Sequence, residues 1–373
     1  MRLVIFPNDP LYSIYEKGEV KIRYWNPNNI FSEIHVISLC DSELSPDKIQ
    51  IMAGSAKLFI HEVGRPNYFS IPFFFNKIKK LVENIKPDII RAHNPSLMGA
   101  LAVFSGNKLN IPVLISLHAD YNPWHNIKIL GLSYFPRVFR DLFSFIFLEP
   151  YSYKYATKIF GVYNFGPREV QKYRDDILVI YNRVYDTQFK FIDKSSKKDT
   201  LKIISVGRHI LGKNSENLIK AIKDLDGFEL LLIGDGPLLP YLKKLVSNLK
   251  LEHKVSFILK VDNSEIHKLY QKSDIFAIAL EYGGVSIPEI EAMAARLPIV
   301  ISKPLWDNDP ELVNKFSITV ENSPAGFRDA FKKLLDDKLR SELGKEAYKQ
   351  FETITGEKME LREADLYKEL LLN

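Results

Sequence analysis

The chain has 373 residues, a length typical of two or three domains. Its hydrophobic fraction of 46% and charged fraction of 26% exclude a disordered tail, a collagen-like rod and a disulfide scaffold. The net charge of +5 requires no anionic partner, and the sequence has neither a basic run nor zinc-finger spacing, so we expect no nucleic-acid partner. The single cysteine, Cys40, excludes an internal disulfide and a cysteine-based metal site.

The sequence has no segment that is typical of a membrane span. The longest stretch without Asp, Glu, Lys or Arg runs from Ala92 to Asn107, which is shorter than the ~20 apolar residues of a spanning helix. The amino terminus leads directly into a strand-like run without the apolar core of a signal peptide. We therefore expect a soluble, cytoplasmic protein.

Short apolar runs alternate with amphipathic helical stretches, such as 73–85 and 97–109, through the first half of the chain. Uniformly apolar strands that alternate with helices predict a parallel sheet covered on both faces. The strand-like runs are 3–7, 34–39, 58–63, 88–93, 113–118, 158–163 and 177–182.

A polar, charged segment at 190–200 then interrupts the pattern, as a linker or exposed loop would. Beyond it the alternation restarts, and a Glu- and Lys-rich tail at 338–373 has helical periodicity without a strand. The strand-like runs of this half are 201–206, 228–233, 255–259, 275–280, 298–302 and 317–320. Two α/β halves with a helical tail are therefore predicted.

Ligands of such sheets bind beyond the carboxyl ends of the strands, so the loops there are candidate sites. After 201–206, Gly207 forms a turn that is followed by Arg208 and Lys213, which together could cradle a phosphate. The alternative is an ordinary loop with two solvated cations. After 228–233, the segment Gly234–Pro237 lacks the third glycine of a dinucleotide fingerprint and predicts only a tight turn.

Two further loops carry chemically suggestive residues. After 275–280, a glycine pair at 283–284 lets a ligand approach the backbone, and the glutamates Glu281, Glu289 and Glu291 could bind hydroxyls or complement the dipole of the next helix. After 113–117, His118 lies where the ligand crevice is expected, although a single histidine can equally be structural.

Several motifs taken in order resemble the retaining glycosyltransferases of family 4. In the second half they are VGR at 206–208 with Lys213, IGDGP at 233–237, and IPEIEAMA at 287–294 followed by LPIV at 297–300. In the first half, PDIIRAHN at 87–94, IPVLISLH at 111–118 and IYNRV at 180–184 resemble strand motifs of the same family. The resemblance covers most of the chain and implies the GT-B fold.

The GT-B fold consists of two Rossmann-like parallel-sheet domains that face each other across a cleft. The resemblance implies an acceptor domain at 1–186, a nucleotide-sugar donor domain at 187–345, and a helical tail at 346–373 that packs back on the amino-terminal domain.

The resemblance also implies roles for individual residues. Arg208 and Lys213, delivered by the Gly207 turn, would hold the diphosphate of the donor, and Glu291 would bind the ribose hydroxyls. Backbone amides at Ser286 and Ile287 would contact the β-phosphate, Lys260 and Val261 would pass along the base, and His118 would reach the donor sugar or its phosphate.

The chain departs from the family at the Glu-x7-Glu motif, which spans eight positions. Counting back from Glu291 places Gly283 where the family has its first glutamate, so that Glu281 would have to substitute from a shifted loop. Glu281 and Glu289 also satisfy the spacing, but Glu289 does not precede Ala-Met-Ala, and we favour the register with Glu291. Glu281 and Gly283 are therefore candidates at the catalytic position.

These observations predict transfer of a sugar from a UDP- or GDP-linked donor to a glycan or lipid-linked acceptor, with retention and without a metal ion or another cofactor. The alternatives are a degenerate, non-catalytic partner and a nucleotide-sugar epimerase on the same fold. Segment 128–148 mixes cations with aromatic residues, so it is either a core helix or a peripheral contact with the inner face of the membrane.

Overall fold

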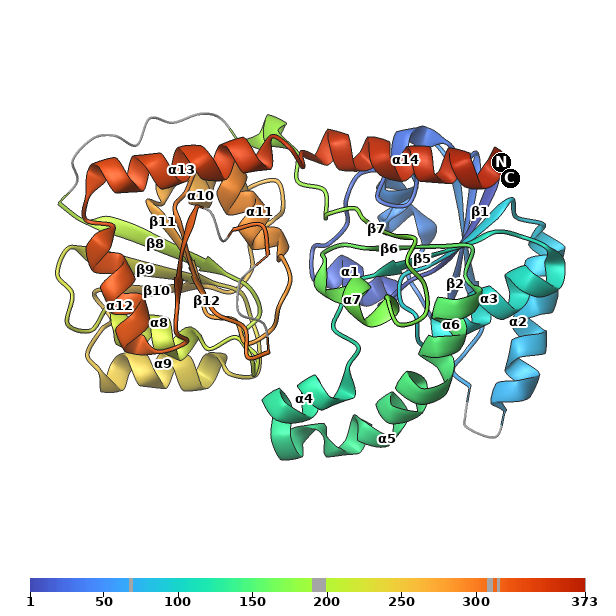
Figure 1. Ribbon diagram of the computed structural model, residues 1–373, viewed down its shortest axis with the longest axis horizontal. Helices are drawn as coiled ribbons and strands as arrows, with labels where there is room; N and C mark the ends of the chain where they lie inside the picture. Colours follow the sequence, from blue (N-terminus) through green and yellow to red (C-terminus); the bar gives the residue numbers. More distant parts are fainter. Residues whose placement is uncertain (67–69, 190–198, 307–310, 314–315, 373) are drawn as a thin grey trace. The chain divides into compact units, whose positions relative to one another are not determined.

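The computed structural model describes residues 1–66, 70–189, 199–306, 311–313 and 316–372, which form two compact units (Figure 1). The first unit contains Met1–Ile127, Gly131–Tyr181 and Met359–Asn373, and the second contains Lys128–Leu130 and Asn182–Lys358. Most of the expected linker, 190–198, lies outside the described residues.

A parallel sheet in the order β3-β2-β1-β4-β5-β6-β7 forms the centre of the first unit. Its middle strands are apolar on both faces because helices cover both, and Leu3–Phe6 in β1 are fully buried. The strands are β1 (Arg2–Phe6), β2 (Glu33–Ser38), β3 (Lys57–Glu62), β4 (Ile89–Ala92), β5 (Val113–Leu117), β6 (Lys158–Gly161) and β7 (Ile177–Val179).

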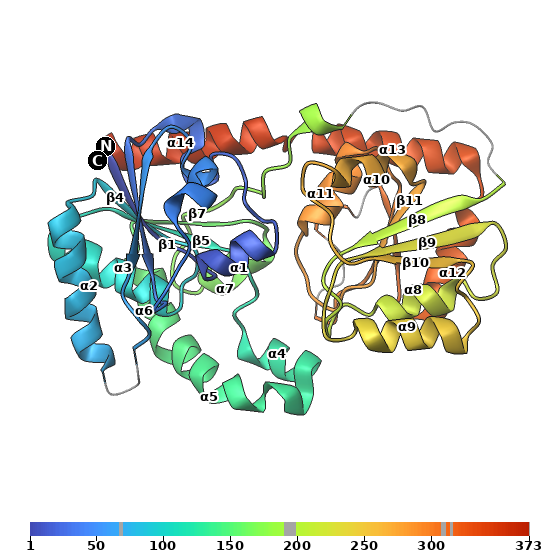
Figure 2. The same cartoon turned by 180° about the vertical axis from the view of Figure 1, so that it is seen from behind.

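One face of this sheet packs against α2, α3 and α6, and the other receives the carboxyl-terminal helix α14 (Figure 2). Short 3₁₀ turns occupy Pro27–Asn29, Pro46–Lys48, Gln50–Ala53 and Gly131–Tyr134. The helices are α1 (Leu11–Glu16), α2 (Ile71–Ile85), α3 (Leu97–Leu109), α4 (Pro123–Leu130), α5 (Phe135–Phe143), the π-helical turn η5 (Ser144–Leu148), α6 (Glu149–Tyr155), α7 (Phe165–Val170) and α14 (Gly356–Leu372).

The second unit repeats the same topology with six parallel strands in the order β10-β9-β8-β11-β12-β13. The strands are β8 (Leu201–Val206), β9 (Phe228–Ile233), β10 (Val255–Ile258), β11 (Ile275–Ile278), β12 (Ile299–Ser302) and β13 (Ser317–Val320). The prediction of two Rossmann-like parallel-sheet domains is therefore confirmed.

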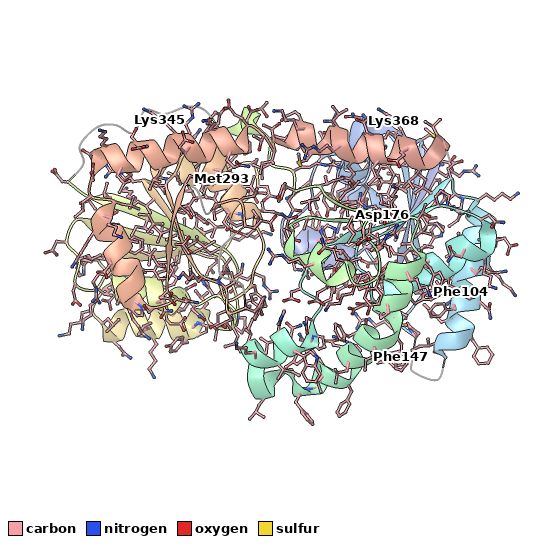
Figure 3. All side chains as sticks on the ribbon, viewed as in Figure 1. Phe104, Phe147, Asp176, Met293, Lys345 and Lys368 are labelled. Carbon is pink, nitrogen blue, oxygen red and sulfur yellow. The ribbon has the colours of Figure 1, made fainter. Side chains whose placement is uncertain are left out.

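Helices α8, α9 and α12 cover one face of the second sheet, and α10, α11 and α13 cover the other. Figure 3 labels Met293 of α11, whose side chain is fully buried. A 3₁₀ turn lies at Asp186–Gln188, and the helices are α8 (Ser215–Ala221), α9 (Leu239–Asn248), α10 (Ile266–Lys272), α11 (Ile287–Ala294), α12 (Pro324–Lys333) and α13 (Asp337–Phe351).

The helical tail divides between the two units. α13 belongs to the second unit, whereas the chain from Met359 onward belongs to the first. The break at Tyr181–Asn182 falls a few residues before position 186, where the sequence placed a domain boundary. Side chains of α14 pack into the first unit, and this contact assigns the end of the chain to that unit. Helical periodicity in the sequence could not predict which of the two sheets the helix covers.

Candidate functional site

The strand order of each sheet reverses beside its first strand, and a ligand crevice is expected at this point in an open α/β sheet. In the second unit the reversal lies between β8 and β11. The loops that follow these two strands carry Gly207, Lys213 and Glu281, so the topology brings together residues that are far apart in the sequence.

Gly207 provides the space that the ammonium group of Lys213 occupies. Its φ angle is +148°, and a Cβ atom here would lie 2.7 Å from Lys213 Nζ. Gly234, at φ +137°, packs against Gly207 so closely that a Cβ would collide with the Gly207 carbonyl oxygen. The turn after β9, which the sequence left without chemistry, therefore supports the loop that carries Lys213.

Backbone hydrogen bonds join the loop after β8 to the loop after β11. Asn214 N donates to Ala279 O over 2.9 Å, and Glu281 N donates to Gly212 O over 2.9 Å. Asn214 Nδ2 also donates to Glu281 Oε1 over 2.7 Å. These contacts fix the half-buried Glu281 close in space to Lys213, with Gly283 two residues farther along the same loop.

Helix α11 starts beside this group, with Ser286 as its N-cap and Ile287 as its first residue. Ser286 N donates to Glu289 Oε2 over 2.6 Å, and Glu289 is fully buried. Burial raises the pKa of Glu289 to about 7, although hydrogen bonds from Ser286 and the charge of Lys213 oppose the shift. Burial also lowers the pKa of Lys213. The charge of Glu289 partly offsets this lowering, and the charge of Arg208 reinforces it.

Glu289 was weighed from the sequence, but the register with Glu291 was preferred. In the structure Glu289 is fully buried and lies close enough to Lys213 for each charge to affect the pKa of the other. The Ser-x-x-Glu spacing at Ser286 is a capping-box signature and could have indicated an inward-facing glutamate at a helix start.

The remaining candidates of the second unit are more dispersed. Arg208 is exposed but close enough to Lys213 to affect its pKa. Glu291 is half-buried beside Tyr270, and burial together with Glu291 raises the pKa of that phenol. Val261 follows β10, which lies two strands from β8.

In the first unit, His118 follows β5, and its ring stacks on that of His93 from the end of β4. The ring centroids are 5.3 Å apart and the planes differ by 13°. His118 Nε2 and Ser116 Oγ lie 2.8 Å apart. Burial, reinforced by the charge of Arg91, lowers the pKa of His118 to about 3, so the imidazole is neutral at pH 7.

Arg91 is fully buried and contacts α14. Its guanidinium forms an ion pair with Glu363, and its Nη1 donates to the Tyr367 hydroxyl over 2.9 Å. Burial opposes the charged form, but Glu363 and Tyr367 outweigh it and raise the pKa of Arg91. No sequence signal links these residues, because Glu363 lies 272 positions from Arg91.

The two sites differ in charge. The second unit presents lysine and arginine at the reversal point, which suits an anion, whereas the first presents neutral imidazoles. Among the residues that the structure describes, no group of three or more His, Cys, Asp or Glu side chains could hold a metal ion. Within the same residues, no helix is both long and apolar enough to cross a membrane.

Two family profiles together match most of the chain. The profile described as Glycosyltransferase Family 4 matches residues 33–187, and the profile described as Glycosyl transferases group 1 matches residues 186–350. The two matches meet at the start of the second unit, so each unit has its own profile.

Individual relatives include glycosyltransferases, as the two profiles do. The alpha-monoglucosyldiacylglycerol synthase of Acholeplasma laidlawii is 24% identical over 62% of this chain and 63% of its own length. An uncharacterized glycosyltransferase of Methanocaldococcus jannaschii is 24% identical over 84% of this chain and 85% of its own length. The match covers less than two thirds of several curated relatives, for example 36% and 58% of two others.

Solved structures share the whole fold. The structure of the Anabaena protein HepE in complex with UDP and glucose has a TM-score of 0.74 and 15% identity, and the alignment covers 99% of this chain and 100% of that one. At this identity the likeness establishes the fold alone.

Proposed function

The chain belongs to the family 4 glycosyltransferases, transferases of class EC 2.4 with the GT-B fold, and on this premise we propose that it transfers a sugar from a nucleotide diphosphate to an acceptor hydroxyl with retention and without a metal ion. One observation carries the proposal. Lys213 is desolvated at the reversal point of the second sheet, beside the buried Glu289 and the amino-terminal end of α11.

The departing nucleoside diphosphate develops negative charge, and preorganised positive groups stabilise such charge in the transition state. We propose that Lys213, Arg208 and the Ile287 amide bind the diphosphate. The Ser286 amide, also expected to contact the β-phosphate, donates to Glu289 Oε2 and would have to exchange that carboxylate for the phosphate. Lys213 is already positioned by the Gly207 turn, so binding requires no large rearrangement of the ammonium group. Removal of one preorganised donor typically raises the barrier by roughly 3–4 kcal/mol.

The other candidates have proposed roles that follow from their surroundings. Glu281 is held by Asn214 and would accept hydrogen bonds from the donor sugar, and Gly283, which has no side chain, would leave room for the sugar. Glu291 would bind the ribose, and Val261 would contact the base. In the first unit, His118 is neutral and hydrogen-bonded to Ser116, so it would contact the sugar as a polar but uncharged group.

A thermal-shift panel with UDP, GDP, ADP and CMP, with and without EDTA, tests the donor site. A ligand at 100 times its Kd stabilises by about 2.7 kcal/mol, which is readily measured. We expect UDP or GDP to shift the melting temperature equally in EDTA, and Arg208→Ala to abolish the shift. Lys202→Ala is the matched control, because Lys202 is an exposed cation near the opposite end of β8.

The outcomes of this panel separate the proposal from its alternatives. If no nucleotide raises the melting temperature, the proposed donor site is wrong. If a nucleoside diphosphate binds but its sugar conjugate yields no free nucleoside diphosphate with any acceptor, the chain is a non-catalytic partner. Conversion of the sugar conjugate into its epimer would instead identify an epimerase.

We further propose that the acceptor is a lipid at an anionic membrane surface. The exposed apolar face of α5 and η5 carries Phe135, Phe139, Phe143 and Phe147 at intervals of four residues, with Leu132 92% exposed just before them. The Phe135 and Phe139 rings are 6.0 Å apart and the Phe143 and Phe147 rings 5.2 Å apart (Figure 3 labels Phe147). An aromatic helix face flanked by cations is typical of interfacial binding.

The cations Arg137 and Arg140 are exposed on the same helix, and α5 lies away from the seven-stranded sheet in both views of the molecule (Figures 1 and 2). The name of the Acholeplasma relative, which describes the synthesis of a glucosylated diacylglycerol, also supports a lipid acceptor. The core-helix alternative does not account for four phenylalanines on an exposed face.

Flotation with vesicles of phosphatidylcholine, with and without phosphatidylglycerol, tests this part of the proposal. We expect binding that requires phosphatidylglycerol and is lost in the double variant Arg137→Glu, Arg140→Glu. A control variant with Lys332→Glu and Lys333→Glu on α12 changes the net charge equally and should bind as wild type does. Equal flotation of all three proteins would contradict the membrane contact.

A further inference from the structure

A pocket opens in the first unit directly beyond the carboxyl end of β5. Its wall begins at Ala119, the residue after His118, and includes residues from η5, α6 and the segment after α7. The lining residues that carry the argument are Asp120, Tyr121, Glu149, Tyr153, Glu169 and Tyr173. All of them belong to the first unit, so the pocket is described without reference to the second.

The lining combines carboxylates with phenol rings. The Tyr153 and Tyr173 rings lie with their centroids 5.6 Å apart. Lys172 also lines the pocket, and its exposed ammonium lies 2.7 Å from Glu169 Oε2, so these two charges balance. Asp120 Oδ2 lies 2.6 Å from His125 Nδ1, which leaves Glu149 as the acidic lining residue without a described ion pair. Such a lining disfavours a phosphate or another anion, whereas carboxylates accept hydrogen bonds from hydroxyl groups and aromatic rings pack against the apolar faces of sugars.

Glu149 is the most unusual lining residue, because its carboxylate is buried and all of its described hydrogen-bond donors are hydroxyls. Ser144 Oγ donates to its Oε1 over 2.9 Å and Ser96 Oγ over 3.3 Å. Its Oε2 receives only the Tyr153 hydroxyl at 3.5 Å, a long and weak contact. Within the described part of the chain, no cation forms an ion pair with Glu149.

A π-helical turn positions this carboxylate. In η5 the backbone N–H of Glu149 donates to the Ser144 carbonyl, so residues five apart are aligned and the two side chains meet. π-helical turns are rare and are found frequently at functional sites. The same turn carries Phe145 in the pocket wall, while Phe143, Ile146 and Phe147 are exposed on the apolar face described above.

We propose that this pocket binds the hydroxyl-rich head of the acceptor, a glycerol or sugar group, and that Glu149 Oε2 accepts a hydrogen bond from one of its hydroxyls. The inference rests on the proposed function, because it assumes that the first unit supplies the acceptor. A head group seated here would leave its lipid chain beside the exposed aromatic residues of η5. Burial raises the pKa of Glu149 to about 7, so head-group binding should strengthen as pH rises through neutrality.

Saturation-transfer NMR with methyl α-glucoside and with glycerol tests the pocket without knowledge of the natural acceptor. Neither probe has a lipid chain, so neither reports on the membrane face. We expect transfer to at least one probe in the wild type, and a signal at least fivefold weaker in Tyr173→Ala and in Glu149→Gln. The probe that responds distinguishes a sugar head from a glycerol head.

Tyr155→Ala is the matched control. Tyr155 is 46% exposed and Tyr173 is 45% exposed, but only Tyr173 lines the pocket. Equal signals in the wild type and all variants, or none from either probe in the wild type, would overturn the inference. The nucleotide thermal shift, measured on the same samples, reports folding and the donor site, so a failure of the proposed function is recognised separately.

Discussion

The two units have the same strand order around the first strand of each sheet, yet they present opposite chemistry at the reversal point. In the second unit, Lys213 lies in the loop after β8, and the buried Glu289 only partly offsets the fall in its pKa. In the first unit, Arg91 lies within β4 and is paired with Glu363 of α14, and the residues that follow β4 and β5 are the neutral His93 and His118.

This difference shows that one Rossmann topology can carry opposite charge at its reversal point, so the topology alone does not select a ligand. Charge decides the ligand, and in the first unit a helix from the opposite end of the chain cancels that charge. A diphosphate therefore suits the second unit, whereas a neutral hydroxyl compound suits the first. Each experiment below changes one side of this comparison.

The largest effect is expected from Glu363→Ala, which leaves Arg91 charged and unpaired in the core of the first unit. Breaking a buried ion pair typically lowers the free energy of unfolding by about 3–5 kcal/mol. Hydrogen exchange should show the loss in β4 and β5 but not in the second sheet. Asp365→Ala on the same helix removes only the exposed pair with Lys368 and should have little effect. Equal protection of β4 in both variants would refute the pairing.

The next largest effect is expected from Lys213→Met, which removes the charge of Lys213 without greatly shortening the side chain. A hydrogen bond to a charged group contributes about 1.5–3 kcal/mol, so the affinity for the nucleoside diphosphate should fall roughly 10- to 100-fold. Calorimetric titration measures this loss. His118→Ala in the first unit should leave the affinity for the nucleoside diphosphate without a sugar unchanged, and a similar loss in both variants would contradict the division of roles.

A smaller effect is expected on the pH dependence of stability, to which a buried carboxyl group in each unit, Glu149 and Glu289, contributes separately. The folded pKa of Glu149, about 7, lies above the ordinary value of 4.5, so the folded state binds more protons between these values and stability falls as pH rises. The slope for one such group is at most about 1.4 kcal/mol per pH unit. His93 and His118, whose pKa values are lowered, act in the opposite direction below pH 6.5.

Glu149→Gln should therefore make the stability of the first unit rise more steeply between pH 5 and 6.5, because Glu149 no longer opposes the contribution of the histidines. Urea unfolding at several pH values, followed by hydrogen exchange in each sheet, measures the slope. Glu289→Gln should change the second unit in the same direction and leave the first unchanged. A wild-type slope in Glu149→Gln would mean that this carboxyl group is not the one that titrates.

The smallest effect is expected at a helix end in the second unit. Asp336 caps α13 by accepting hydrogen bonds from Lys338 N over 2.9 Å and Leu339 N over 3.3 Å. Asp336→Ala should lower stability by about 1 kcal/mol, whereas Asp336→Asn retains the cap. Thermal unfolding of the two variants gives the difference, and exchange rates in the first sheet should not change. Equal melting temperatures would mean that the cap contributes nothing.

Much of the fold could be predicted from local patterns. Uniformly apolar runs predicted the strands of both sheets, and several, such as 201–206 and 228–233, agree at both ends because each is bounded by polar or glycine residues. Other predicted runs, such as 88–93 and 177–182, extend past the observed strands, because apolar residues are also buried beyond a strand's end, as Ile180 is. The prediction that Lys213 and His118 are site residues rests on their positions after strands.

Other features had no local signal. The spacing of Glu281, Glu289 and Glu291 admits two registers, and nothing in the sequence indicates that Glu289 is fully buried within the electrostatic influence of Lys213. The role of Glu149 depends on the π-helical turn, which aligns it with Ser144 across five residues instead of the usual four.

The sequence by itself determined the two-sheet architecture and the order of the loops at the ligand edge, because strand burial and glycine turns are local properties of the chain. Only the tertiary structure decided the electrostatics of the two sites. The charge of Arg91 is set by Glu363, 272 residues away, and the environment of Lys213 by Glu289 from another strand–helix unit. Electrostatic effects depend on distance in space and on burial, and neither can be read from positions along the chain.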